Sequence, residues 1–383
     1  MHPGNGPPRT GGAYLYISER MNIYDIAISF VPSLGPKGAA HLVECFGSAE
    51  AVYAATADEM VRRAELNERI ARAIASGAGM REAEREADYC RRNGITPVGV
   101  SDGDYPPLMR LTPDHPAVLY VCGNTAALRR QALAFVGTRN MSAYGQSMCR
   151  SLIEGLAQLY PEAAIVSGLA FGIDAAAHRA ALDAGMATVA VIANALPRVT
   201  PPAHERLAAQ IAAAGGAIVT EMSSQSPQNG RMYIPRNRLI AAMSAATVVV
   251  ESPTSGGSLT TAACADGYSR TVMAVPGRAT DMRSGGTNAL IRNRRAALVT
   301  SAEDIAAELA WDLGAAAAEP QRERLPLTDD ERRLLELFGD GPAAAEELQQ
   351  LSGLAAGELS LLLMNLELSG AVRRLPGKRY ERI

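Results

Sequence analysis

The sequence predicts an α/β protein built on a parallel sheet, with a small helical domain before the sheet and a helical domain with a hairpin after it. Three observations support this prediction. Between residues 131 and 300, short apolar strands alternate with helical segments, as in parallel sheets that are covered on both faces. The preceding residues favour short helices. The final segment combines helical patterns with a Pro-Gly turn, and a chain of 383 residues is long enough for three domains.

The bulk composition is that of a globular protein and excludes several other classes. Hydrophobic residues make up 48% and charged residues 20% of the chain, and no apolar run is long enough to predict a membrane span. Residues 1–13 are rich in Gly and Pro and lack the apolar core of a signal peptide, so we expect a disordered tail. The five cysteines are scattered, which favours a cytoplasmic protein without a disulfide framework or zinc site.

Residues 14–92 are expected to form the helical domain. Val31 to Ser48 reads as a helix, a Gly-Pro hairpin and a second helix. One interpretation is a SAM or helix-hairpin-helix-like module whose turn amides contact a nucleic-acid backbone. The favoured alternative is a compact packing domain, because one Gly-Pro hairpin is weak evidence. Arg81–Arg92 predicts a charged helix that closes this domain.

Residues 93–310 are expected to form the sheet domain, with a core at 131–300. Because ligands of open parallel sheets bind beyond the carboxyl ends of the strands, the loops that follow the strands are the first place to look for function. The predicted strands are Ile95–Val100, Ala117–Val121, Leu133–Val136, Ala163–Val166, Thr188–Ile192, Ala217–Val219, Thr247–Val250, Val272–Val275 and Ala297–Val299.

The first motif is F-V-G-T-R-N-M-S, from Phe135 to Ser142, between a strand and a helix. It is not G-x-G-x-x-G, so the dinucleotide fingerprint is missing at its required place. Arg139 suits a phosphate, and the alternative is that it caps nearby carbonyls.

The second motif, V-S-G-L-A-F-G-I-D-A-A-A-H-R-A-A, runs from Val166 to Ala181. Its turn enters a helix, and a helix start favours an anion. Asp174 and His178 share one helix face and invite an acid–base interpretation. No nucleophile motif such as G-x-S-x-G accompanies them, so we favour a structural role in framing the turn.

Two further motifs also begin helices. I-P-R-N-R-L-I-A-A-M-S, from Ile234 to Ser244, carries two arginines that are expected to diverge, one into the crevice and one into an ion pair. S-P-T-S-G-G-S-L-T-T-A, from Ser252 to Ala262, offers N–H and O–H donors. It is not a P-loop.

Four donor-rich helix entries at one sheet edge indicate a groove for several successive phosphates, and hence a polynucleotide. Residues 131–300 contain 14 Arg, no Lys and 9 acidic residues, which gives +5, although the whole chain carries −3. Arginine binds phosphate bidentately and stacks on bases. No metal-ligand cluster or cofactor motif is present, and we expect neither a metal nor a cofactor.

Residues 311–325 read as a linker and 326–383 as a winged helix. Thr328 and Glu331 form a capping-box signature, two more helices follow, and a hairpin surrounds Pro376-Gly377. The third helix, Gly357–Ser369, contains two glutamates and no Lys or Arg. We therefore favour docking of a protein over reading of duplex DNA.

Taken together and in this order, the motifs resemble the DNA-processing protein A family (DprA, also called Smf). They are V-G-T-R, V-S-G-L-A-F-G-I-D-A-A-A-H-R-A-A-L, P-R-N-R-L-I-A-A-M-S, S-G-G-S-L-T-T-A, A-V-P-G and G-G-T-N-A-L-I. The resemblance implies an extended Rossmann-like domain that binds single-stranded DNA, protects it during natural transformation and loads the RecA recombinase. It also implies a homodimer formed through that domain, a cytoplasmic location and no catalytic activity.

The resemblance also implies which residues line the DNA groove. The family commonly has Arg or Lys where this chain has Phe171, so a stacked base would replace a phosphate contact there, unless the ring is buried. The implied groove residues are Gly137, Thr138, Arg139, Ser142, Ser167, Gly168, Ala170, Phe171, Gly172, Arg236, Asn237, Arg238, Ser255, Gly256, Gly257 and Ser258.

Two other functions remain open at this point. A Rossmann-like enzyme of the phosphoribohydrolase type would use Asp174, His178 or Glu251 on a mononucleotide, but its P-G-G-x-G-T-x-x-E motif is not matched. A structural partner protein whose sheet binds nothing is disfavoured by the arginine-only charge of the middle domain.

Overall fold

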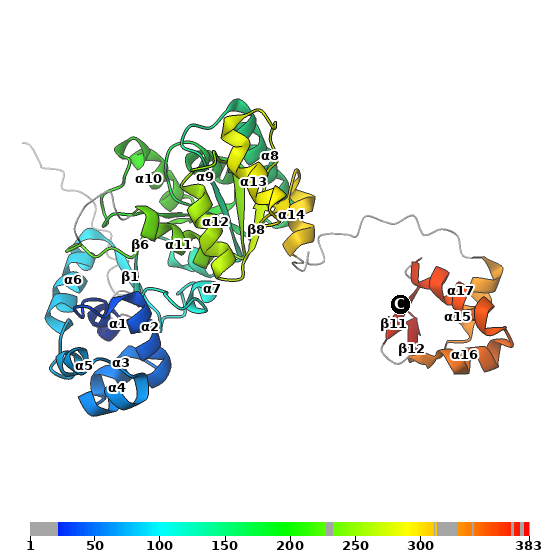
Figure 1. The fold of residues 1–383 in the computed structure, drawn as a ribbon, viewed down its shortest axis with the longest axis horizontal. Coiled ribbons are helices and arrows are strands. Elements are labelled where there is room, and N and C mark those ends of the chain that lie inside the picture. Colours follow the sequence, from blue (N-terminus) through cyan, green and yellow to red (C-terminus); the bar gives the residue numbers. More distant parts are fainter. Residues whose placement is uncertain are drawn as a thin grey trace, which may run out of the picture. The chain divides into compact units, whose positions relative to one another are not determined.

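The computed structural model describes residues 22–226, 233–309, 311, 328–338, 341–368, 371–375 and 379–382. The chain divides into two compact units, one ending at Asp312 and one beginning at Leu313 (Figure 1). The predicted tail at 1–13 and most of the linker at 311–325 lie outside the described residues. The predicted division of the first unit at residue 92 stays a prediction.

From residue 22 on, six helices come first in the described part of the first unit. The sequence predicts short helices there and a charged helix over Arg81–Arg92. Asn22 and Ser48 cap two of them with side-chain oxygens, and Thr56 forms a capping box with Glu59. Their apolar faces enclose a small core that includes Leu42, Val52 and Met60. The helices are α1 (Ile23–Ser29), α2 (Gly35–Phe46), α3 (Ala49–Ala54), α4 (Ala57–Ala64), α5 (Glu68–Ala75) and α6 (Met80–Asn93).

A nine-stranded sheet forms the centre of the first unit, in the order β1-β2-β6-β5-β4-β3-β7-β8-β9. Each predicted strand is present, with ends shifted by no more than two residues. The pairings of β2 with β1 and β6 are antiparallel, and all other pairings are parallel. The strands are β1 (Thr96–Gly99), β2 (Val118–Gly123), β3 (Ala132–Gly137), β4 (Ala164–Ser167), β5 (Ala187–Val191), β6 (Ala217–Thr220), β7 (Ala246–Glu251), β8 (Thr271–Ala274) and β9 (Ala297–Leu298).

Helices cover both faces of this sheet (Figure 1). Leu133 and Phe135 of β3 pack with α8, α9 and α14, whereas Ala134 and Val136 pack with α11 and α12, because successive strand residues point to opposite faces. The helices are α7 (Pro107–Arg110), α8 (Ala143–Leu159), α9 (Ile173–Asp183), α10 (Glu205–Ala213), α11 (Tyr233–Met243), α12 (Ser258–Gly267), α13 (Gly285–Arg292) and α14 (Ala302–Leu309).

The strand order reverses between β3 and β7. From β3 the chain builds β4, β5 and β6 on one side, then returns through α11 to place β7 on the other side of β3. The loops that leave β3 and β7 therefore diverge. Such a reversal opens a crevice at the carboxyl ends of the strands, where ligands of this fold class bind.

The second unit has the three helices and hairpin that the sequence predicts for a winged helix. Thr328 and Glu331 form the predicted capping box, and the second strand of the hairpin also pairs with a third, unpredicted strand. The predicted Pro376-Gly377 turn lies outside the described residues. The elements are α15 (Asp329–Glu336), β10 (Ala343–Ala344), α16 (Ala345–Ser352), α17 (Ala356–Leu368), β11 (Val372–Leu375) and β12 (Arg379–Arg382).

Candidate nucleic-acid interface

A groove of about 370 Å³ lies at the point where the strand order reverses. It is lined by the loops after β3, β4 and β7 and by the start of α11, so most of the predicted helix entries meet there. The predicted residues that line it are Gly137, Thr138, Arg139, Ala170, Asp174, Arg236, Asn237, Gly256, Gly257 and Ser258. The groove is also lined by Val136, Ile234, Ile240, Pro253 and Thr261, which the sequence analysis did not single out.

The loops after β3 and β4 are locked together through backbone contacts. The Thr138 carbonyl accepts the Ile173 amide at 3.2 Å, and the Thr138 amide donates to the Glu251 carbonyl at 2.7 Å. Gly172 has a φ of +76°, and a Cβ there would lie 2.1 Å from the Thr138 carbonyl oxygen. Only glycine permits this approach. The Ile173 amide is therefore used inside the protein rather than presented to an anion.

Ser142 faces inward. Its hydroxyl donates to the Glu251 carboxylate at 2.6 Å, its amide donates to the same carboxylate at 2.8 Å, and its oxygen caps α8 by accepting the Gly145 amide. Glu251 is 1% exposed. These bonds make Glu251 the anchor of the β3–α8 loop, which accounts for a buried carboxylate without a catalytic role.

Ser167 and Gly168 frame the turn after β4 and do not line the groove. Ser167 is fully buried, and its hydroxyl donates to the Phe135 carbonyl at 2.6 Å. A Cβ on Gly168 would lie 2.7 Å from both the Arg236 guanidinium and an Asp174 carboxylate oxygen. The absence of a side chain at Gly168 thus lets a cation and an anion approach the same backbone.

Arg236 is the buried cation of this frame. It is 5% exposed and donates to the Gly168 carbonyl at 2.7 Å and to the Val191 carbonyl. Asp174 accepts the Ala170 amide at 3.3 Å. Burial raises the pKa of Asp174, and the positive charge of Arg236 opposes this shift. Arg236 therefore ties the turn after β4 to the end of β5 while it forms part of the groove wall.

His178 has a structural environment. Its Nδ1 lies 2.7 Å from the Thr188 hydroxyl, which itself donates to the Ile165 carbonyl. Since that hydroxyl has one proton, the His178 Nδ1–H is the donor between them. Burial is the main cause that lowers the pKa of His178 to about 3. The ring is neutral near pH 7 and joins α9 to β5, in agreement with the favoured structural interpretation.

Arg236 and Arg238 diverge as predicted. Arg238 forms an ion pair with Glu221, and its Nε lies 3.9 Å from Asp114, away from the groove lining. Asn237 lies between the two arginines, accepts from Arg236 at 3.3 Å and donates to the Gly257 carbonyl at 3.2 Å. Asn237 thereby fixes the loop after β7 to α11.

The loop after β7 presents both buried and exposed groups. The Ser258 hydroxyl donates to the Ser252 hydroxyl at 2.9 Å and is buried, whereas Ser255 and Gly257 are exposed. A Cβ on Gly256 would lie 2.3 Å from the Ser252 hydroxyl oxygen. This loop lines the groove with Pro253 and with Gly256 to Ser258, and the two glycines contribute backbone only.

Phe171 is 49% exposed, so the ring is not buried. It packs edge-on against His204, with ring centroids 4.7 Å apart, and His204 is held by the Leu169 carbonyl at 2.8 Å. Phe171 lies outside the groove lining, on the turn whose neighbour Ala170 is part of it. His204 therefore supports the ring on one side, and the exposed part of the ring stays accessible beside the groove.

Exposed arginines follow several strands at this edge. Arg139 follows β3 and lines the groove. Arg198 follows β5, and Arg278 and Arg283 follow β8, and all three are exposed. The sequence analysis did not single out these last three. Their position between a strand and the helix that follows it was the signal that would have identified them.

The described residues contain no group of three or more His, Cys, Asp or Glu side chains placed to hold a metal ion. In the same residues, no helix has the length and apolar character needed to cross a membrane. Beside the apolar residues and the Asp174 carboxylate of its lining, the groove offers backbone groups, one exposed guanidinium, and amide and hydroxyl groups, which are suited to holding phosphates and bases.

The family models match both units. The model described as DNA recombination-mediator protein A matches residues 96–310, and the DprA winged helix domain matches residues 315–378. Protein Smf of Escherichia coli is 36% identical over 282 residues, which cover 71% of this chain and 74% of that protein. The putative DNA processing protein DprA of Mycobacterium tuberculosis is 36% identical over 362 residues, 88% of this chain and 89% of that protein.

Two solved structures share the fold. The X-ray structure of DprA from Streptococcus pneumoniae aligns with a TM-score of 0.65 and 28% identity, over 76% of this chain and 99% of that one. DprA from Helicobacter pylori, described for its single-stranded DNA binding mode, aligns with a TM-score of 0.50 and 25% identity, over 57% and 96% of the two chains. Because family models match the sheet domain and the winged helix, and two relatives are 36% identical over more than two thirds of the chain, the chain belongs to the DprA/Smf family, the DNA recombination-mediator protein A family.

Proposed function

We propose that this protein processes DNA by binding single strands along the carboxyl edge of its sheet. The Helicobacter pylori relative, which shares the fold, is described as binding single-stranded DNA. The observation that carries the proposal is the charge of this edge. Arg139, Arg198, Arg278 and Arg283 are exposed in loops after three different strands.

Three acidic groups near the same edge are engaged within the protein. Glu251 is bonded to Ser142, Asp174 is buried beside Arg236, and Glu221 is paired with Arg238. A strand laid across the loops therefore meets exposed cations, while these three anions are already engaged. Several cations spaced along an edge suit a polymer of phosphates better than a single mononucleotide.

The enzymatic alternative receives less support. The three groups that a nucleotide hydrolase would use are Asp174, His178 and Glu251. Each is buried and bonded within the protein. We therefore propose a binding protein without catalytic activity, which protects single strands and loads the RecA recombinase onto them in the cytoplasm during natural transformation. We further propose a homodimer formed through the sheet domain.

Salt dependence of DNA binding tests this function. Fluorescence anisotropy with a labelled single strand and its duplex is measured between about 50 and 200 mM salt, because phosphate neutralisation gives a slope of about 0.7 per contact on a single strand. We expect tighter binding of the single strand and a steep slope. Displacement of the strand by AMP alone at low concentration would favour the enzymatic alternative.

Arg139→Ala is the matching variant, with Arg69→Ala on exposed α5 as the control. Loss of one phosphate contact is expected to reduce the slope by about 0.7 and to weaken binding to different sequences equally. Equal affinity and slope in wild type and Arg139→Ala would remove Arg139 from the interface.

A further inference from the structure

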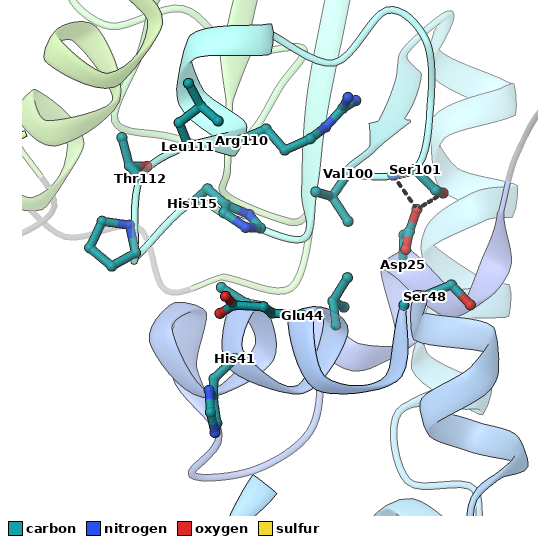
Figure 2. A pocket seen from close by; sticks show the side chains of 14 residues that line it. Asp25, His41, Glu44, Ser48, Val100, Ser101, Arg110, Leu111, Thr112 and His115 are labelled. Atoms are coloured by element: carbon teal, nitrogen blue, oxygen red, sulfur yellow. Dashed lines mark hydrogen bonds between the residues drawn. The ribbon is translucent and has the colours of Figure 1, made fainter. Parts of the chain in front are cut away.

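A second and larger cavity, of about 730 Å³, lies between α2 and the segment from Val100 to His115. None of its lining residues belongs to the groove at the sheet edge. Figure 2 shows residues of both walls, with His115 extending from the 110–115 segment toward α2 and His41 pointing away on the far side of α2. Its volume is in the range of sites that enclose small organic ligands.

One end of this cavity holds an incompletely bonded carboxylate. Asp25 on α1 is fully buried, and its Oδ2 accepts the Ser101 amide at 3.3 Å and the Ser101 hydroxyl. Within the described residues, its Oδ1 is buried and has no hydrogen-bond partner. A buried acceptor without a donor is costly, so a ligand that brings an N–H to this oxygen gains the bond without displacing an existing one.

A second unsatisfied atom belongs to the same cavity. His115 is 8% exposed, and its Nδ1 is buried without a partner among the described residues. Figure 2 places its ring between the 110–115 segment and α2. Burial lowers the pKa of His115, so the ring is neutral near pH 7 and bonds as donor or acceptor according to its tautomer.

The remaining lining combines apolar walls with charges at the mouth. Val43 and Val100 form parts of the opposite walls, and Leu111 is 75% exposed although it is large and apolar. Arg110 and Glu44 are both exposed and carry opposite charges. The lining therefore favours a flat, uncharged body with polar groups at its edge, and it offers one cation for an anionic substituent.

We propose that this cavity binds a nucleoside or nucleotide whose base carries an exocyclic amine, such as adenine or cytosine, with the amine donating to Asp25 Oδ1. The base lies against Val43, Val100 and Leu111, His115 bonds a ring nitrogen or a sugar hydroxyl, and Arg110 meets the phosphate of a nucleotide. A neutral base satisfies both buried atoms without bringing a second charge into the protein. This site goes beyond the proposed DNA groove, which shares no residue with it.

Two pairs of ligands test the amine directly on the wild-type full-length chain. Calorimetry or ligand-observed NMR compares adenosine with inosine, and cytidine with uridine, because each second member has a carbonyl where the first has the amine. We expect the amine-bearing member to bind about tenfold or more tightly, since the bond involves a carboxylate. Equal binding within both pairs overturns the proposal, as does no binding of any of the four.

Asp25→Asn is expected to reverse the ligand preference in the same measurement. Because Ser101 donates twice to one oxygen of residue 25, the asparagine carbonyl takes that place and its NH₂ faces the cavity. We expect this variant to prefer inosine over adenosine. Glu84→Gln on exposed α6 is the matched carboxylate-to-amide control and keeps the wild-type preference. An unchanged preference in Asp25→Asn overturns the assignment of the amine to Asp25.

The same base chemistry comes from a free nucleotide or from the end of a DNA strand. AMP and a short oligo(dA) are therefore measured against wild type and Asp25→Asn. The source that enters the cavity loses affinity about tenfold in the variant, and loss by neither overturns the proposal. If the DNA groove alone were wrong, single-strand binding would fail while the adenosine preference persisted.

Discussion

Two surfaces of this protein belong to folds that commonly bind nucleic acid, the carboxyl edge of the large sheet and the third helix of the winged-helix unit. They differ in charge. The loops at the sheet edge expose Arg139, Arg198, Arg278 and Arg283, whereas α17 has exposed Glu358 and Glu367 and no basic residue.

The second surface is also apolar. A hollow of about 510 Å³ on α16 and α17 is lined by Leu359, Leu363 and Met364, with Glu346 and Glu367 beside them, and Met364 is 50% exposed. Two basic residues of the hairpin make local contacts, since Arg373 pairs with Glu381 and Arg379 donates to the Pro342 carbonyl. The comparison shows that a fold sets where side chains stand, while their charge decides what they bind.

The largest expected effect tests whether Arg236 holds the loops of the sheet edge together or contacts DNA directly. Arg236→Ala removes a buried guanidinium that bonds two carbonyls and leaves Asp174 buried without its nearby cation. We expect the free energy of unfolding to fall by about 3–5 kcal/mol, measured by chemical denaturation. Single-strand affinity would fall as a consequence of the damaged fold.

The contrary result is equally clear. A variant with unchanged unfolding free energy and weakened DNA binding would make Arg236 a direct contact, as the family resemblance implied. Arg206→Ala, at an exposed position of α10, is the control that shows how loss of an exposed arginine changes the unfolding free energy.

The pH dependence of the unfolding free energy tests whether His178, like Arg236, has a structural role. Its folded pKa of about 3 lies below the unfolded value of about 6.5, so the unfolded chain takes up the proton first as pH falls. The stability contribution of this ring is complete above pH 6.5 and is lost toward pH 3. Between pH 7 and pH 5 we expect a loss of about 2 kcal/mol.

His178→Asn isolates this effect, because the amide keeps a donor for Thr188 and has no proton to gain. Asp174, whose pKa burial raises, contributes the opposite trend in both proteins. If the unfolding free energies of the two proteins depended on pH in the same way, the pKa of His178 would not be lowered by burial, and this interpretation of the ring would be wrong.

Phe171 tests whether the edge binds bases as well as phosphates. Its half-exposed ring rests on His204, and stacking of one base is worth about 1–3 kcal/mol. Phe171→Ala should weaken single-strand binding by roughly fivefold or more with little change in salt slope, while Phe171→Tyr should retain it. Wild-type affinity in Phe171→Ala would leave the ring only its contact with His204.

The smallest effect is expected from the acidic unit. Removal of residues 313–383 should change single-strand affinity by less than about twofold, because α17 offers no cation for phosphate. Anisotropy at low salt, where electrostatic contacts are strongest, is the most sensitive measurement. A tenfold loss would show that the second unit contributes DNA contacts and would remove the contrast between the two surfaces.

The sequence predicts the elements of this fold better than the directions of its side chains. Apolar strands between helices are local patterns, so β3 to β9 and the capping box at Thr328 could be identified before the structure was known. Ser142 and Ser167 were expected to face DNA, yet their hydroxyls bond Glu251 and the Phe135 carbonyl. Those partners lie far away in the chain, and no spacing rule reveals them.

The directions of Arg236 and Arg238 also depend on partners that lie far away in the chain. The divergence of Arg236 and Arg238 was predicted, but which of them would be buried depends on the Gly168 and Val191 carbonyls. Asp25 and His115 drew no attention in the sequence because neither belongs to a motif. Their importance appears only when the fold places both on one cavity.

The two outer strands of the sheet limit how copies of this protein can associate. At one border β9 has only two residues, and at the other β1 carries Pro97, which lacks an amide proton. Neither border offers a run of free backbone donors long enough to recruit a strand from another molecule. Along a DNA strand, where many copies would crowd together, such borders disfavour growth of a continuous intermolecular sheet, and the proposed dimer would have to join through side chains.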